Sequence, residues 1–116
     1  MAGIVFLKTA DIDSVKEFYM NKIGMTLWLD QGACIILRSG NLILGFCRGK
    51  EPQTEGVITF FYESKEDVDN MYDKAGGEHE PRENEEFRIY HFYAKDPEGR
   101  NVEFQTFLHP IDYKFH

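Results

Sequence analysis

The stretch IVFLKTADIDSVKEFYMNKIG, from Ile4 to Gly24, has a divergent second copy in VITFFYESKEDVDNMYDKAGG, from Val57 to Gly77. Each copy opens with a short apolar run, continues with a helix N-cap signal and an apolar stripe at i, i+3, i+4 spacing, and stops at a glycine. Few residues are identical, but the shared pattern predicts a strand followed by a helix in both copies. The chain is therefore expected to contain one supersecondary unit twice.

The helix starts carry different signals in the two copies. Asp11 or Asp13 can cap the first helix, whereas Ser64 followed by Asp67 has the form of a capping box in the second. The apolar stripes predict which side chains each helix buries. They are Val15, Phe18, Tyr19 and Ile23 in the first helix, and Val68, Met71, Tyr72 and Ala75 in the second.

Strand signals follow each helix. In the first copy they are MTLWLDQ, ACIILRS and NLILGFC, and the last two are joined by the dipeptide Gly40-Asn41, which suits a two-residue hairpin. This turn would place Ser39 opposite Leu42 and Cys34 opposite Cys47. We therefore expect an antiparallel hairpin whose two cysteines face each other.

The second copy continues with a weak segment around HEPRENEE and a strand within FRIYHFYAK. The sequence Asp96-Pro97-Glu98-Gly99 fits a type I turn, and a last strand follows it. Each unit thus reads βαβββ. We place the first module at about residues 1–49, a polar linker at about 50–55, the second module at about 56–107 and a tail at 108–116, all within one domain.

Composition excludes several classes of protein. Of the 116 residues, 42% are hydrophobic and 15% aromatic, which is enough for a packed core. A net charge of −7 argues against nucleic acid and anionic membrane as partners. No run is long enough to span a membrane, and the first residues lack the pattern of a signal peptide, so we expect a cytoplasmic protein. In that compartment Cys34 and Cys47 are expected to be thiols, with a redox pair as the alternative.

The last strand carries a carboxylate where an apolar residue would be ordinary. Its alternation divides Val102, Phe104 and Thr106 from a second face with Glu103 and Gln105. The second face also holds Asn101 and Phe107. Either this face meets solvent, or it lines a pocket.

The tandem βαβββ repeat, with DIDSVKEFYMNKIGM in the first module and DPEGRNVEFQ in the second, resembles the vicinal-oxygen-chelate superfamily. That superfamily includes glyoxalase I, bleomycin-resistance proteins and extradiol dioxygenases. The resemblance covers nearly the entire chain. It implies an α+β fold in which the two modules form a curved mixed sheet around a cavity, and, in the enzymes of the group, a divalent metal held by the first and last strands of each module.

Most of the metal-ligand positions implied by the resemblance hold residues that cannot bind a metal. The two first-strand histidines correspond to Ile4 and Val57, and the glutamate of the first module falls within Ile43-Leu44-Gly45. Only the fourth position, Glu103, holds a side chain that can bind a metal. One carboxylate does not offset the dehydration of a transition metal, so we expect no metal and no other cofactor. His91 is the best candidate for a substitute ligand, with a divalent metal as the alternative.

The implied cavity face supplies the candidate binding residues. Glu103 is the candidate catalytic residue, and Lys8 is its expected ion-pair partner because Ile4, Phe6 and Lys8 alternate onto one face of their strand. Arg82 or Arg88, in the acidic loop, could steer an anionic ligand. The predicted ligand-binding set is Phe6, Lys8, Trp28, Phe46, Thr59, Phe61, Glu103, Gln105 and Phe107.

Three functions remain open, in this order of preference. The first is a metal-free protein that binds a small organic molecule in an aromatic cavity. The second is a lyase, isomerase or dioxygenase relative that uses a metal, or Glu103 as a general base. The third is a structural or interaction module that has lost its site. We also expect a homodimer with two-fold symmetry, because the apolar tail FLHPIDYKFH must pack on its own module or on a second copy.

Overall fold

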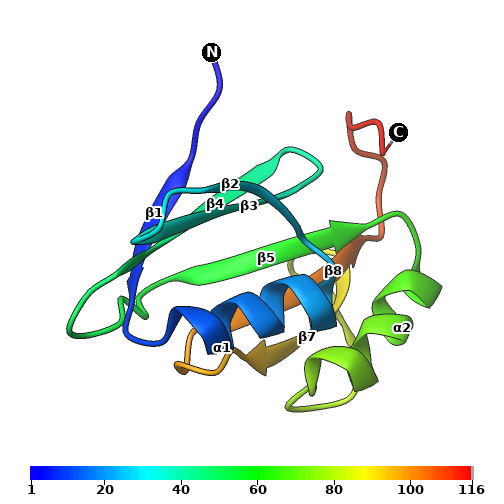
Figure 1. Cartoon of the computed structure of the whole chain (residues 1–116). Coiled ribbons are helices and arrows are strands. Elements are labelled where there is room, and N and C mark those ends of the chain that lie inside the picture. Colours follow the sequence, from blue (N-terminus) through cyan, green and yellow to red (C-terminus); the bar gives the residue numbers. More distant parts are fainter. Residues whose placement is uncertain (116) are drawn as a thin grey trace. The chain divides into compact units, whose positions relative to one another are not determined.

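The computed structural model describes residues 1–115 and shows two compact units, here called module one and module two (Figure 1). Module one comprises Met1–Thr54 together with Pro97–Gly99. Module two comprises Glu55–Asp96 and the residues from Arg100 onward.

Module one has the predicted order of elements. These are β1 (Val5–Thr9), α1 (Ile12–Lys16), its π-helical continuation η1 (Glu17–Ile23), β2 (Thr26–Asp30), β3 (Cys34–Ser39) and β4 (Leu42–Arg48). The sheet order is β1-β4-β3-β2, with β1 parallel to β4 and the other pairs antiparallel. The expected hairpin register is confirmed, since Ser39 faces Leu42 and Cys34 faces Cys47.

The first helix begins at a cap made by two distant parts of the chain. Asp11, one of the two predicted caps, accepts the backbone N–H of Ser14 at 3.1 Å. The Glu98 carboxylate accepts the backbone N–H groups of Ala10 at 2.8 Å and of Asp11 at 3.2 Å, and also the hydroxyl of Thr9. Glu98 of the predicted DPEG turn therefore satisfies N–H groups at the start of a helix, where negative charge is favoured.

The core of module one lies between its helix and the sheet. Val15, Tyr19, Leu37 and Phe46 are fully buried there, and the rings of Tyr19 and Phe46 lie 4.9 Å apart. Burial of large apolar side chains such as these is the main term that stabilises the module, at roughly 25 cal/mol per Å² removed from water. Val15, Phe18 and Tyr19 of the stripe predicted from sequence are thus buried, and Tyr19 packs on Phe46 of the sheet.

Cys34 and Cys47 form a disulfide, which corrects the expectation that both are free thiols. They occupy directly opposed positions on the antiparallel strands β3 and β4. Side chains at such positions point to the same face and lie close enough to bond. The facing positions of the two cysteines were predicted correctly. The expectation of free thiols, which followed from the expected cytoplasmic location, was wrong.

Module two repeats the pattern with a regular helix. Its elements are β5 (Val57–Tyr62), α2 (Lys65–Ala75), β6 (Arg82–Asn84), β7 (Ile89–Lys95) and β8 (Asn101–Phe107), and its sheet order is β5-β8-β7-β6. β5 is parallel to β8, and the remaining pairs are antiparallel. The predicted α+β class and the tandem βαβββ units are therefore confirmed, with the strands in two four-stranded mixed sheets.

The second helix starts and ends for identifiable reasons. Ser64 accepts the backbone N–H of Asp67 at 3.2 Å, which confirms the predicted N-cap, and its hydroxyl donates to the Asp67 carboxylate at 3.0 Å. The helix ends at Gly76, in the left-handed region with φ of 72°, one residue before the predicted Gly77. Gly77 instead allows the Tyr72 ring to approach the backbone, because a Cβ at this position would lie 2.4 Å from that ring.

No helix among residues 1–115 is long and apolar enough to cross a membrane.

Candidate functional site

The sheet of module two has one face packed on α2 and one that is not. Phe92 contacts Tyr72 of α2, and Phe104 stacks on Phe92 at 4.9 Å, so these residues mark the helix side. By strand alternation the polar residues point the other way, onto what we call the site face. Three rows of facing residues cross the site face. They are Thr59 with Glu103 and Tyr93; Phe61 with Gln105, His91 and Arg82; and Val57 with Asn101 and Lys95.

Glu103 is the centre of a hydrogen-bond network on the site face. Its residue is only 8% exposed, yet its carboxylate is satisfied: Oε1 accepts the Thr59 hydroxyl at 2.9 Å, and Oε2 lies 2.7 Å from Nδ1 of His91. A buried carboxylate without partners would cost several kcal/mol. These two partners come from β5 and β7 of its own module.

Tyr93 joins the network from the next strand. Burial raises the pKa of Tyr93, and the charge of Glu103 and a hydrogen bond to that carboxylate raise it further. The phenol therefore stays protonated and can act as a donor. The backbone N–H of Tyr93 is directed to Nε2 of His79 at 3.4 Å, and the His79 and His91 rings lie 6.3 Å apart.

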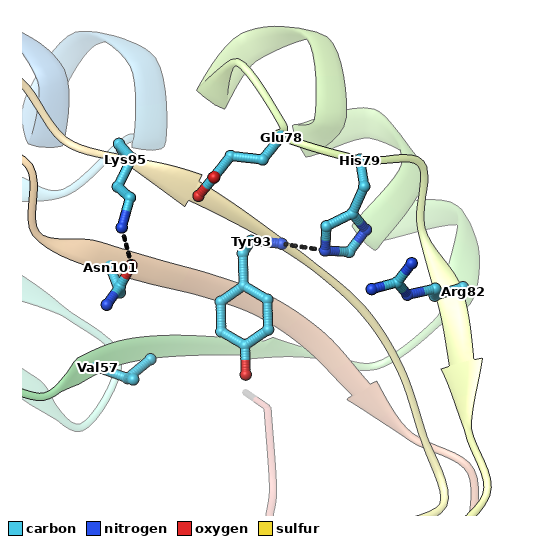
Figure 2. A pocket seen from close by; sticks show the side chains of 7 residues that line it. All are labelled: Val57, Glu78, His79, Arg82, Tyr93, Lys95 and Asn101. Carbon is cyan, nitrogen blue, oxygen red and sulfur yellow. Dashed lines mark hydrogen bonds between the residues drawn. The ribbon is translucent and has the colours of Figure 1, made fainter.

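A cavity of about 420 Å³ opens beside this network (Figure 2). Tyr93 and His79 line it, and they also contact the Glu103 network, so the two features are continuous. The volume lies within the range of small-molecule sites. The remaining lining residues are Val57, Glu78, Arg82, Lys95 and Asn101.

The opposite end of the site face is covered by the C-terminal tail. The Phe61 ring lies 5.8 Å from Phe107, 4.8 Å from Tyr113 and 5.5 Å from Phe115. The tail thus packs on its own module, one of the two outcomes expected; His116, its last residue, lies outside the described part of the chain. Phe61 and Phe107, predicted to line the ligand cavity, instead form an aromatic cluster with the tail.

The predicted site residues of module one divide into three environments. Phe46 is fully buried beside Tyr19, so its ring is a core element and not a lining residue. Trp28 is 45% exposed on the edge strand β2, and Phe6 is 50% exposed on β1. Lys8 lines a second cavity, of about 530 Å³, with residues 50–53 of the linker.

Two arginines, Arg82 and Arg88, were expected near an anionic ligand, and the structure places them in different surroundings. Arg82 lies on β6 and lines the 420 Å³ cavity. Arg88 lies in the turn before β7, where its backbone carbonyl accepts the N–H of Leu108 at 2.8 Å. Arg88 is not among the residues that line the 420 Å³ cavity.

The donor set does not fit the divalent metal implied by the resemblance. Ile4 and Val57 are apolar, and a Cβ at Gly45 would lie 2.3 Å from the ring of Phe6, so an aromatic ring covers the third position. The carboxylate of Glu103 is hydrogen-bonded directly to His91. Within residues 1–115, no three His, Cys, Asp or Glu side chains are grouped as metal ligands would be.

Sequence reasoning missed several members of the site. His79, Tyr93, Lys95 and Asn101 were not in the predicted ligand-binding set, although Asn101 was placed on the same strand face as Glu103. Period-two alternation along RIYHFYAK was the available signal, because it places His91, Tyr93 and Lys95 on one face, and a strand pairing would have put that face beside Glu103.

The fold of the chain is that of glyoxalase/bleomycin resistance protein/dioxygenase proteins. A family enzyme of that description from Burkholderia phytofirmans matches with a TM-score of 0.78 at 19% identity, over 89% of this chain and 95% of that chain. A protein of the same description from Nocardioides matches with a TM-score of 0.75 at 18% identity, over 98% and 88%. A possible glyoxalase from Bacillus cereus is 26% identical, with a TM-score of 0.70 over 90% and 96%.

These matches confirm the predicted resemblance at the level of the fold. No family model and no curated protein matches the sequence.

Proposed function

We propose that module two binds a small organic molecule on its site face, in the cavity beside Glu103, without a metal ion. The observation that carries this proposal is the Glu103 network itself. A carboxylate, an imidazole, a phenol and a hydroxyl are gathered on the sheet face away from the helix, where apolar packing would have served stability better. The network continues into a cavity of ligand size.

The chemistry of the lining residues supports a polar rather than a purely aromatic site. One ring wall is provided by Tyr93 and His79, while charged groups of Glu78, Arg82 and Lys95 surround it. A few oriented polar groups around a ring-lined cavity are the usual basis of small-molecule specificity. The proposed site is therefore lined mainly by polar residues, whereas the sequence predicted a mainly aromatic cavity.

The enzyme alternative is best supported by one distance, the 2.7 Å between His91 Nδ1 and Glu103 Oε2. Because Glu103 already has partners on both oxygens, it is poorly suited to act as the base itself. A carboxylate that orients a histidine is a common arrangement for acid–base chemistry. Acid–base chemistry in this site would therefore pass through His91.

Ligand binding to Glu103→Gln tests the proposal, with Glu83→Gln as the matched control. Glu83 is also a sheet glutamate of module two, but it pairs with Lys65 at the surface, away from the cavity. A ligand found by copurification or by a thermal-shift screen should bind the control as it binds the wild type, and Glu103→Gln more weakly. Equal binding to both variants would refute a site centred on Glu103.

Elemental analysis tests the metal-free part of the proposal. Protein purified without chelator should contain no stoichiometric Zn, Ni, Fe or Mn, because the inherited ligand positions offer one carboxylate. Stoichiometric metal that is lost in Glu103→Ala would contradict it and would favour the metal-dependent enzyme.

We also propose that the chain forms a homodimer. Module one exposes several large apolar side chains on its edge strands, among them Val5, Phe6 and Trp28, and such a surface is usually covered in solution. Sedimentation should give twice the chain mass at micromolar concentration. A particle of 13.6 kDa would contradict the dimer.

A further inference from the structure

We infer that the ligand of the site face is a flat organic acid that also carries a hydroxyl group: its anionic group meets Arg82, and its hydroxyl donates to Nε2 of His91. This inference rests on the proposed function and names the ligand class for the same site. It follows from the protonation pattern of His91, from the accessibility of its second nitrogen and from the position of Arg82.

His91 is oriented by the carboxylate beside it. Nδ1 lies 2.7 Å from Oε2 of Glu103, and an ionised carboxylate can only accept, so the proton of this hydrogen bond belongs to Nδ1. A neutral imidazole with its proton on Nδ1 presents Nε2 as an acceptor. Thr59 holds the other carboxylate oxygen, which fixes the position of the pair.

Nε2 of His91 is available to a ligand. It has no hydrogen-bond partner among residues 1–115, where the contacts of this ring are the Nδ1 bond and the neighbouring Tyr93 and His79 rings. Every fully buried side-chain nitrogen or oxygen in that part of the chain has a partner. Nε2 therefore keeps accessible surface, although the residue as a whole is only 7% exposed.

Arg82 supplies a cation next to this acceptor. It is the direct cross-strand partner of His91 in the pairing of β6 with β7, so both side chains leave the sheet on the same face. Its guanidinium forms no hydrogen bond or ion pair with another residue of the described chain, and Figure 2 shows it extended toward His79 and Tyr93. A guanidinium without a partner is suited to bind a carboxylate or phosphate through two parallel hydrogen bonds.

The charge of the cavity also favours an anion. Arg82 and Lys95 outnumber Glu78 among its lining residues, in a chain whose net charge is −7. Lys95 is held by a hydrogen bond to Asn101, which keeps the second positive charge at the cavity wall. A local positive site on an acidic protein attracts small anions and disfavours cationic ligands.

The aromatic rings beside the two polar contacts favour a flat ligand. Tyr93 and His79 line the cavity beside Arg82 (Figure 2), and the His91 ring lies next to both rings, at 5.4 Å from Tyr93 and 6.3 Å from His79. A flat ligand stacked on these rings, with its anionic group at the guanidinium, would therefore have His91 beside it. Removing the anion or the hydroxyl from such a ligand should cost affinity, because each group then leaves a polar protein atom without its partner.

A matched series of probes tests the inference: benzoate, phenol, 3-hydroxybenzoate and 4-hydroxybenzoate, titrated into ¹⁵N-labelled full-length protein. We expect at least one hydroxybenzoate to bind roughly tenfold more tightly than benzoate and phenol, and to shift the Nε2 resonance of His91. We also expect the free protein to carry the His91 proton on Nδ1. Arg82→Gln should weaken the binding of each of the three acids roughly tenfold. Arg88→Gln, which changes an arginine outside the cavity, should weaken the binding of none of them.

The possible failures are distinguishable. If phenol and benzoate bind the site face as well as the hydroxybenzoates do, or if Arg82→Gln leaves their affinities unchanged, the ligand class is wrong although the site binds organic molecules. A His91 proton on Nε2 in the free protein would likewise refute the assigned acceptor. If no probe shifts resonances of Tyr93, His79 or His91, both the ligand class and the proposed binding function are refuted.

Discussion

Replacing Thr59 by valine should destabilise module two, because it removes one hydrogen bond to a buried carboxylate without changing the shape of the side chain. The Thr59 hydroxyl donates to Oε1 of Glu103 at 2.9 Å, and Glu103 is 8% exposed. A hydrogen bond to a charged group contributes about 1.5–3 kcal/mol to stability. We therefore expect the free energy of unfolding to fall by about 2 kcal/mol, which corresponds to a decrease in Tm on the order of 8 °C.

Urea denaturation monitored by circular dichroism measures this change, with Thr54→Val as the control at an exposed threonine. The double variant Thr59→Val with Glu103→Gln completes a cycle. The loss from Thr59→Val should be smaller when residue 103 is neutral, since the charge accounts for part of the bond. If Thr59→Val is as stable as the control, or if the two changes are additive, the Glu103 network is not formed as described.

Three further predictions concern module two. Gly77→Ala should destabilise the protein by about 1–3 kcal/mol in chemical denaturation, because the new Cβ would lie 2.4 Å from the Tyr72 ring; a neutral effect would contradict that close approach. Burial raises the pKa of Tyr62 to about 12 from 10.0, so the stability this phenol contributes is present below pH 10 and is lost as the pH rises to 12. Tyr62→Phe should therefore lose less stability than the wild type over that interval, and an identical pH profile would refute the shift. Deleting residues 108–116 should expose the Phe61 ring and increase the binding of a hydrophobic dye, whereas unchanged dye binding would show that the tail does not cover it.

Much of the fold could be predicted because its signals are local. The N-cap at Ser64, the hairpin register that pairs Cys34 with Cys47, and the turn after Asp96 each depend on residues a few positions apart. The repeated order of these signals was sufficient to predict two βαβββ units. That inference needed no knowledge of how the strands pair across the sheet.

The parts that could not be predicted depend on residues distant in sequence. Glu98 caps α1 from the other end of the chain, and no local pattern connects it with Ala10 and Asp11. His91 lies 12 residues before Glu103 in the sequence, and only the pairing of β7 with β8 brings the two side chains together. The aromatic residues of the tail and Phe61 were both noticed, yet their contact depends on where the chain turns after Phe107.

A crystal structure of the protein with its copurified molecule, or with a bound organic acid, tests the central claim most directly. We expect the molecule on the site face of module two, with an anionic group at the Arg82 guanidinium and the ligand against the Tyr93 ring. A molecule bound instead in the cavity of module one beside Lys8 and Gln53, with the site face of module two unoccupied, would contradict the account.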